Sequence, residues 1–158
     1  KAGGELAIAS LSQHYLIRTS WVVGQGRNFV DTMRKLARSG VSPRVVNDQT
    51  GRLTFADELA RASAHLLEQG APYGTYHVTN SGQAATWADI ASWVFAQEGR
   101  DASDVIPVST AEYYGDELRT AAPRPASSLL DITRLCDTGF TPMTQKFGLE
   151  EHLRQDAT

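Results

Sequence analysis

The sequence is poor in the residues that build disulfides and in long apolar runs. Its 158 residues include one cysteine, Cys136, which excludes an internal disulfide and a CxxC metal or redox motif. No apolar run approaches the roughly 20 residues of a membrane-spanning helix, and no signal segment opens the chain. We therefore expect no membrane partner and a cytoplasmic protein.

The sequence also lacks an excess of positive charge. Lys and Arg number 15 against 18 Asp and Glu, so the net charge is −3. This balance argues against nucleic acid as the main partner, because phosphate binding requires a basic surface. The four histidines are too scattered for metal-ligand spacing, so no metal site is expected from the residues alone. With 41% apolar and 21% charged residues, the chain suits one globular domain.

The phosphate-binding turn GxGxxG of dinucleotide-binding folds is missing as well. The GQG at 24–26 follows a predicted strand but lacks the third glycine, and a tight strand-to-helix turn is the better interpretation. No GxSxG elbow surrounds a serine, and Cys136 has no histidine near it in the sequence. Hydrolase chemistry is therefore poorly supported.

The sequence does contain an alternation of strand-like and helix-like segments. Strands are predicted at 15–24, 44–48, 75–79 and 105–108, and helices at 2–12, 28–40, 54–70, from 86, 132–138 and 147–155. The first helix has little charge and is predicted to be largely buried. The alternation predicts an α/β fold with parallel strands.

Three polar residues stand where helix N-caps belong. Asn28 precedes an apolar stripe that begins with Phe29, Thr54 precedes the helix that ends near Gly70, and Thr86 with Asp89 forms a capping-box pattern. Such side chains accept hydrogen bonds from the free backbone N–H groups of a first turn. These caps predict where the three helices begin.

Two places have both a functional and a structural interpretation. Ser20 and Trp21 lie at the carboxyl end of a predicted strand, where open α/β sheets bind ligands. Arg124 stands between Pro123 and Pro125, which would hold its guanidinium rigidly for bidentate contact with a phosphate or carboxylate. A core tryptophan and a surface salt bridge are the structural alternatives.

Five ordered segments carry a family resemblance. They are IRTSWVVG (17–24), NFVDTM (28–33), VVNDQTGRLT (45–54), YHVTNSG (76–82) and APRPASSLLD (122–131). They resemble the C-terminal half of the dTDP-4-dehydrorhamnose reductases, which are extended short-chain dehydrogenases/reductases. KAGGELA at the start is similar to the segment after the tyrosine of the family's YxxxK motif, so Lys1 would be that motif's lysine.

The resemblance implies a domain organisation. Residues 1–158 would form a C-terminal sugar-nucleotide-binding domain, with 1–24 a remnant of the Rossmann core and 25–158 the substrate-binding region. The N-terminal Rossmann half, with the cofactor turn and the proton-donating tyrosine, would be absent. The parent protein is then expected to use NADPH to reduce dTDP-4-dehydro-L-rhamnose to dTDP-L-rhamnose, while this chain by itself is inactive.

The resemblance also implies roles for individual residues. Lys1 and Ser20 would contact the cofactor, with Lys1 also catalytic. Trp21 would pack against the deoxysugar, Asn28 and Phe29 would lie near the nucleotide, and Arg124 would neutralise diphosphate charge. Ser127 stands where the family has an asparagine in this loop.

Asp57 matches a position that some members link to a magnesium-bridged subunit contact. This resemblance makes Mg²⁺ and a homodimer expectations for the chain.

Rival interpretations remain open. The parent could be another nucleotide-sugar epimerase or dehydratase of the family, or a non-catalytic relative such as the regulatory subunit of methionine adenosyltransferase. The RTSWVVG and DQTG segments favour the reductase. The parent could also be fused to the 3,5-epimerase that precedes it in the pathway.

Overall fold

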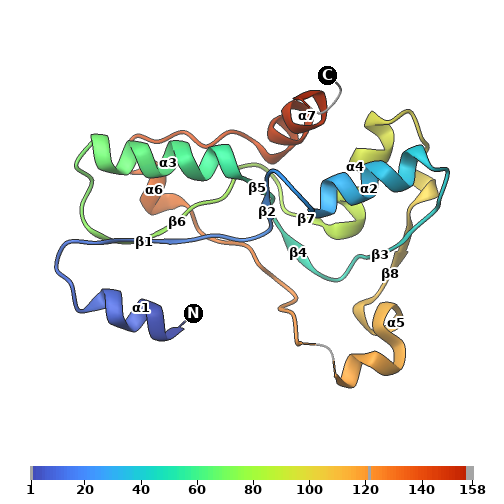
Figure 1. Cartoon of the computed structure of the whole chain (residues 1–158), viewed down its shortest axis with the longest axis horizontal. Helices are drawn as coiled ribbons and strands as arrows, with labels where there is room; N and C mark the ends of the chain where they lie inside the picture. Colours follow the sequence, from blue (N-terminus) through green and yellow to red (C-terminus); the bar gives the residue numbers. More distant parts are fainter. Residues whose placement is uncertain (1, 121, 156–158) are drawn as a thin grey trace.

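The computed structural model describes residues 2–120 and 122–155 as an elongated molecule with helices along both sides (Figure 1). The longest helices follow the predicted order. The α-helices are α1 (Ala2–Ala9), α2 (Phe29–Arg38), α3 (Ala56–Glu68), α4 (Trp87–Gln97), α5 (Thr110–Tyr114), α6 (Thr133–Cys136) and α7 (Gln145–Gln155), and two 3-10 helices are η1 (Ala102–Asp104) and η2 (Gly115–Arg119).

The described strands are short and form four pairs. They are β1 (Tyr15–Arg18), β2 (Val22–Val23), β3 (Arg44–Val46), β4 (Thr50–Gly51), β5 (Thr54–Phe55), β6 (Gly74–His77), β7 (Ala85–Thr86) and β8 (Ile106–Val108). The pairs β1–β6, β2–β5 and β3–β8 are parallel. Parallel strands are predicted, but β5 lies at the start of the range predicted as a helix, 54–70. The pair β4–β7 is antiparallel. The sequence does not predict it, because a two-residue strand shows no alternation of apolar and polar residues.

Two hydrophobic clusters form the core. The larger one joins α2, α4 and α7 with β2, β3 and β5, and Val30, Ile90 and Phe95 are fully buried in it. The smaller one lies between α3 and the β1–β6 pair and includes Leu66 and Tyr76. Figure 1 shows the corresponding arrangement, with α3 along β1 and β6 at one end and α2 beside α4 at the other.

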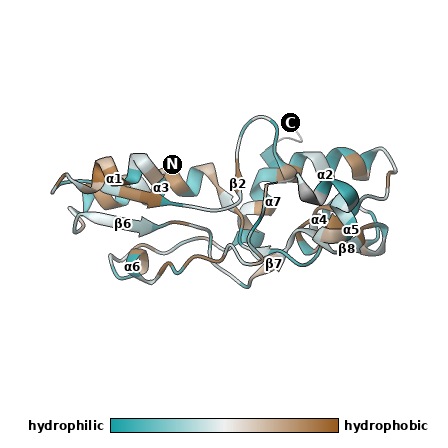
Figure 2. Ribbon diagram, turned by 90° about the horizontal axis from the view of Figure 1, so that it is seen from below, coloured by the Kyte–Doolittle hydropathy of each residue, from teal (hydrophilic) through white to brown (hydrophobic). Residues whose placement is uncertain are grey.

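The prediction that the first helix is buried is wrong for this structure. α1 contains no buried residue, and Leu6 is 75% exposed. It lies on the side of β1 away from α3 (Figure 1), and Figure 2 shows brown hydrophobic stretches on it. Among the described residues, the ion pair between Glu5 and Arg18 at 2.5 Å is the side-chain interaction that connects α1 to the rest of the molecule. The apolar side of α1 is exposed.

The strand predicted over 15–24 is interrupted. β1 ends at Arg18 and β2 begins at Val22, because Trp21 between them has a φ of 46°. That left-handed backbone cannot continue a strand. The carboxyl end of β1 is therefore followed by a bend, and Trp21 lies at this bend.

Two of the three predicted caps are confirmed. The Asn28 side chain accepts from the N–H of Asp31, and Thr86 and Asp89 form a complete capping box. Thr54 is not a cap. Its hydroxyl donates to the carbonyl of Ser20 at 2.7 Å, and α3 starts after Phe55 without a side-chain cap.

Candidate functional site

Three aromatic rings meet where β2 follows the bend after β1. The rings of Trp21 and Trp87 are stacked, with centroids 3.9 Å apart and planes at 22°. Phe29 packs against Trp87 at 4.6 Å and 57°. All three side chains are half-buried. We call these three residues the aromatic cluster; two of them, Trp21 and Phe29, are predicted site residues.

Strand pairing brings these rings together from three parts of the chain. The carbonyl of Trp21 accepts from the N–H of Thr54 at 3.0 Å, which fixes the bend beside β5. Trp87 directly follows β7, and β7 pairs with β4 through Gly51 and Ala85. An ideal Cβ on Gly51 would lie 2.7 Å from Trp21 Cε2. The glycine therefore permits the close approach of β4 to the indole.

A hollow of about 510 Å³ lies beside the aromatic cluster. Its apolar wall includes Phe29 and Trp87. Cationic and amide groups also line it, from Arg27, Arg44 and Gln49. Flat rings beside arginines and an amide suit a ligand with an aromatic base and negatively charged groups.

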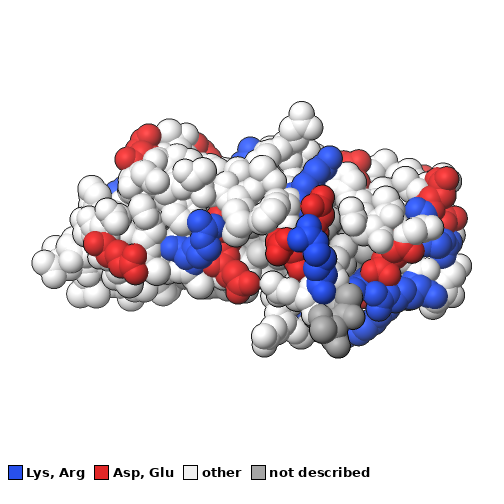
Figure 3. Space-filling view, turned by 90° about the horizontal axis from the view of Figure 1, so that it is seen from above, with Lys and Arg blue, Asp and Glu red and all other residues white. Residues whose placement is uncertain are grey.

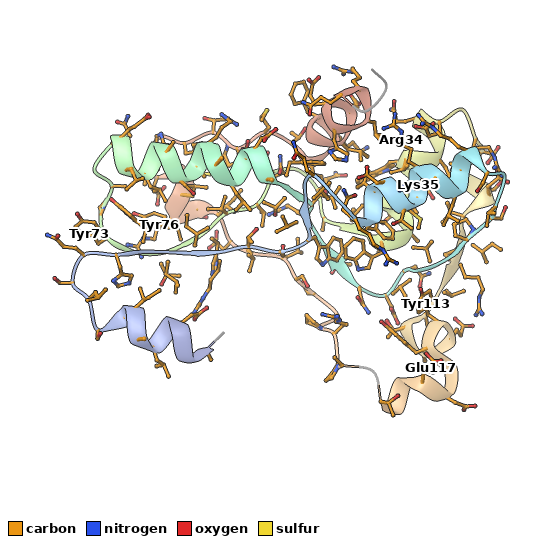
Figure 4. All side chains as sticks on the ribbon, in the orientation of Figure 1. Arg34, Lys35, Tyr73, Tyr76, Tyr113 and Glu117 are labelled. Carbon is orange, nitrogen blue, oxygen red and sulfur yellow. The ribbon has the colours of Figure 1, made fainter. Side chains whose placement is uncertain are left out.

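The segment α5 closes one side of this hollow with Tyr113 and Tyr114. Figure 4 shows Tyr113 on the side of α5 that faces β3. The segment is attached to the end of β3 because Asp48 accepts from the Thr110 hydroxyl at 2.6 Å and from its N–H at 2.9 Å. These hydrogen bonds, the hydroxyl first, lower the pKa of Asp48, so the attachment is made by a carboxylate at neutral pH.

Asn28 uses its amide within the chain. The amide nitrogen donates to the carbonyl of Gly24 at 2.8 Å and lies 2.6 Å from Asp31 Oδ2, while its oxygen accepts from the N–H of Asp31. Asn28 also lines the hollow. The structure therefore shows a side chain that fixes the start of α2 and has both amide hydrogens engaged.

Of the predicted site residues, Asn28 and Phe29 line the hollow. Trp21 does not line it and is stacked on Trp87, which does.

The other predicted site residues lie apart from the hollow or outside the described residues. Arg124 is exposed and is not among the residues lining the hollow. The loop after it is tied to β4, since Thr50 donates to the Ala126 carbonyl at 2.8 Å. Lys1 lies outside the described residues, so the structure does not place it.

Ser20 has an unusual hydroxyl. Among the side chains that the structure describes, Ser20 Oγ is the one buried polar atom without a hydrogen-bond partner. A buried hydroxyl without a partner costs free energy unless another group completes it. Ser20 directly precedes Trp21, so this free hydroxyl lies at the same bend as the aromatic cluster.

Asp57 lies at a second, larger hollow of about 670 Å³ between α7, α3 and the loop after β2. Asp31 and His152 also line it, and these two are paired at 2.9 Å. Within residues 2–120 and 122–155 no group of three or more metal-ligating side chains comes together. The expectation of Mg²⁺ at Asp57 therefore has no support in this structure.

The sequence prediction missed Trp87 and the lining residues Arg27, Arg44, Gln49 and Tyr113. The pattern around Trp87 predicts only a helix. A usable signal is present, because a tryptophan directly after a capping threonine begins its helix at the surface. Gln49 lies in the DQTG segment that carries the family resemblance, but the resemblance implies no role for it. Arg44 and Tyr113 have no local signal, because β3 and α5 come together only through tertiary contacts that include the β3–β8 pairing.

The RmlD substrate binding domain family matches residues 1–157 of the chain. The chain belongs to this family. It is 36% identical over 156 residues to "Spore coat polysaccharide biosynthesis protein SpsK" of Bacillus subtilis, covering 98% of this chain and 52% of that protein. It is 33% identical over 144 residues to a dTDP-4-dehydrorhamnose reductase of Mycolicibacterium smegmatis, covering 90% of this chain and 42% of the relative.

A solved structure of a dTDP-4-dehydrorhamnose reductase is also similar to this chain. The dTDP-4-dehydrorhamnose reductase of Bacillus anthracis, in complex with NADP, matches with a TM-score of 0.85 and 34% identity, over 98% of this chain and 53% of that chain. This RmlD-family chain thus spans about half the length of the relatives it matches. Among its described residues no helix is long and apolar enough to cross a membrane.

Proposed function

We propose that this chain is the substrate-binding part of an NADPH-dependent reductase that converts dTDP-4-dehydro-L-rhamnose to dTDP-L-rhamnose. The observation that carries the proposal is the aromatic cluster beside a nucleotide-sized hollow, in a chain whose residues 1–157 match the RmlD substrate binding domain. Relatives at 33% identity bear the name of this reductase. The parent is further proposed to carry the N-terminal Rossmann half and the tyrosine.

In this proposal, different residues contact the sugar, the nucleotide and the diphosphate of the substrate. Trp21 packs against the deoxysugar, and the walls formed by Phe29 and Trp87 contact the nucleotide. Arg27 and Arg44 supply positive charge to the diphosphate within the hollow. Asn28 acts by holding the start of α2, because its own amide is engaged.

Arg124 is proposed as an outer contact to the diphosphate. Its exposed side chain is available to a ligand, and its loop is held to β4 through Ala126 and Ser128.

The described residues do not by themselves fit a complete NADPH site. The turn at 24–26 leads into α2, but Asn28 already occupies the N–H of Asp31 there, and the GxGxxG pattern is absent. Ser20 Oγ, buried and without a partner, is the atom that fits a contact with a cofactor at the bend. The proposal therefore assigns Ser20, with Lys1, to the cofactor side and derives no chemical step from them.

Ligand titration tests the proposal directly. The chain is titrated with dTDP, dTDP-L-rhamnose and UDP-glucose while tryptophan fluorescence is followed. We expect selective quenching by the two dTDP ligands, because Trp87 lines the hollow and Trp21 is stacked on Trp87, so both indoles would sense occupancy. Binding of UDP-glucose as tightly as dTDP-L-rhamnose, or no binding of either dTDP ligand, would contradict a preformed dTDP-sugar site on this chain.

The proposal also predicts that the isolated chain does not catalyse the reaction. Mixed with NADPH and dTDP-4-dehydro-L-rhamnose, it should leave the NADPH absorbance unchanged, because the sequence holds neither the cofactor turn nor a YxxxK tyrosine. The matched control is the parent reductase under the same conditions. Steady NADPH consumption by the chain alone would show that this division of roles is wrong.

A further inference from the structure

We propose that Trp87 and Gly51 form a mount that fixes the orientation of Trp21, with Trp87 as a positioning residue for recognition of the sugar. The proposal rests on the proposed function, because it takes Trp21 as the residue that meets the deoxysugar. It assigns to Gly51, and to Trp87 in addition to its wall in the hollow, an effect on the sugar that is exerted through the Trp21 side chain. Three independent features of the structure support it.

The first feature is the backbone of Trp21 itself. With a φ of 46°, it is the one residue other than glycine with a positive φ among residues 2–120 and 122–155. A bulky side chain in this region is strained, and such strain persists only where the surroundings impose it. The bend therefore fixes the direction in which the Trp21 indole leaves the backbone. The contacts around the ring offset the free energy of this strained backbone.

The second feature is the partner ring. Trp87 stacks on Trp21 with centroids 3.9 Å apart. Its own position is fixed by its place in α4 and by a second aromatic ring. It is the first residue of α4, directly after the N-cap Thr86 and within the capping box that Thr86 forms with Asp89. Phe29 packs against its ring at 4.6 Å. The indole of Trp87 is thus anchored at its backbone and at its ring, so it presents a fixed surface to Trp21.

The third feature is the missing side chain at Gly51. A Cβ there would lie 2.7, 2.8 and 2.9 Å from three ring atoms of Trp21, closer than atoms pack in proteins. Gly51 is buried and paired with Ala85 in the β4–β7 ladder, so its backbone cannot easily retreat. Its φ is not in the left-handed region. Glycine is therefore required here for clearance from the indole.

Together these contacts fix the orientation of the Trp21 indole in the unliganded chain. A side chain that is already ordered loses less conformational entropy on binding, and misplacement by about 1 Å of a group that orients substrate is costly. The mount should therefore affect the sugar-dependent part of the affinity more than the part contributed by the nucleotide. Comparing dTDP-L-rhamnose with dTDP separates the two parts.

The test begins with the unliganded chain. Two stacked indoles couple their electronic transitions and give a paired positive and negative band in the circular dichroism spectrum. We expect this couplet in the unsubstituted chain, its loss in Trp87→Phe, and a reduction by more than half in Gly51→Ala, which keeps both indoles. Trp93→Phe is the control for losing a tryptophan. Gly4→Ala is the control for Gly→Ala, since a Cβ on Gly4 meets no atom within 4 Å.

The second arm measures affinity. Gly51→Ala should weaken dTDP-L-rhamnose binding about tenfold and change dTDP binding by less than about threefold. Trp87→Phe, which keeps an aromatic ring and provides a second variant if Gly51→Ala does not fold, should weaken dTDP-L-rhamnose more than dTDP. Cooperative thermal unfolding of each variant verifies that it is folded.

The possible results distinguish a failure of the proposed mount from a failure of the proposed function. A couplet that is absent from the unsubstituted chain, or unchanged in Gly51→Ala, overturns the mount whatever the ligand data show. Equal weakening of dTDP and dTDP-L-rhamnose in both variants also overturns it. Failure of the unsubstituted chain to bind any dTDP ligand overturns the proposed function and the sugar-recognition role with it, while the dichroism still decides whether the rings are held as described.

Discussion

At the scale of single residues, the site is built by side chains that are held by their neighbours. Asn28 has both amide hydrogens engaged, and Trp21 is stacked on Trp87. Ser20 Oγ differs, since it is buried and lacks a partner. Residues of the first kind fix geometry, whereas a free hydroxyl remains available to a ligand or to another part of the protein.

Replacing Trp21 tests whether it serves binding or only packing. Trp21→Ala removes a half-buried ring, so the melting temperature should fall by only a few degrees, while dTDP-L-rhamnose affinity should fall about tenfold or more. Fluorescence titration and thermal unfolding give the two values. A large loss of stability with unchanged affinity would mean that Trp21 is a core residue.

Glu58 illustrates a buried charge with a structural role. Its side chain is fully buried. It pairs with Arg61 at 2.5 Å and accepts from the N–H of Met143 at 2.8 Å. The carboxylate thus connects α3 to the segment that leads into α7.

Glu58→Ala should lower the free energy of unfolding by about 2 kcal/mol, because it leaves the N–H of Met143 without its acceptor, whereas the half-exposed Arg61 can be hydrated instead. Glu58→Gln should cost less, since its amide oxygen still accepts from Met143. Glu68→Ala, on an exposed position of the same helix, is the control and should change stability by about 0.5 kcal/mol or less. Equal effects of Glu58→Ala and Glu68→Ala in denaturant unfolding would refute this role.

At the scale of elements, an ion-pair cluster joins three helices. Glu98 at the end of α4 accepts from Arg34 at 2.8 Å and from Arg38 at 2.7 Å, both on α2. Arg34 also donates to the carbonyl of Leu153 in α7 at 2.9 Å. Figure 4 labels Arg34 on α2 near α7, and Figure 3 shows basic and acidic side chains interleaved over this end of the molecule.

The pKa of Glu98 gives this cluster a pH dependence. Burial alone would raise the pKa, but hydrogen bonds from Arg38 and Arg34 outweigh it, and the pKa is lowered. A lowered pKa in the folded state means that the carboxylate stabilises the protein above its unfolded pKa of about 4.5, and that this contribution disappears as the pH falls through the folded value.

Glu98→Gln should therefore cost about 2 kcal/mol at pH 7, and the difference from the unsubstituted chain should shrink below about pH 4. Denaturant unfolding across this pH range measures it. The control is Glu150→Gln, whose exposed pair with Arg154 at 3.5 Å should be worth less than about 1 kcal/mol. A constant difference at every pH would exclude the ionised carboxylate as the cause.

At the scale of the whole molecule, one helix remains uncovered. α1 has no buried residue, and Leu6 and Leu11 on and after it are 75% and 58% exposed. Exposed apolar surface of this kind favours association with another protein surface. In the proposed parent the N-terminal half would provide that surface.

The isolated chain should therefore self-associate as its concentration rises. Leu6→Lys should reduce the association measured by light scattering during size-exclusion chromatography. Leu67→Lys on α3, at a position that is 68% exposed, is the control and should leave the association unchanged. If the chain stays monomeric at all concentrations, or if both variants reduce the association equally, α1 is not the surface through which the chain self-associates.

The sequence by itself determined the order of the long elements and the caps that begin α2 and α4. These features depend on residues close together in the chain, as with Asn28 and Asp31 or Thr86 and Asp89, so periodicity and spacing reveal them. The resemblance of the five ordered motifs to the dTDP-4-dehydrorhamnose reductases is likewise confirmed, by the RmlD family match over residues 1–157 and by relatives of that name.

Only the tertiary structure decided the surroundings of Trp21. Gly51 and Trp87 reach it through the antiparallel β4–β7 pair, and Thr54 is drawn from its predicted cap to the Ser20 carbonyl. These contacts join residues about 30 or more positions apart in the chain, beyond the reach of local periodicity. Their formation depends on which short strands pair and how closely a glycine lets two elements approach, and no local pattern in the chain records either.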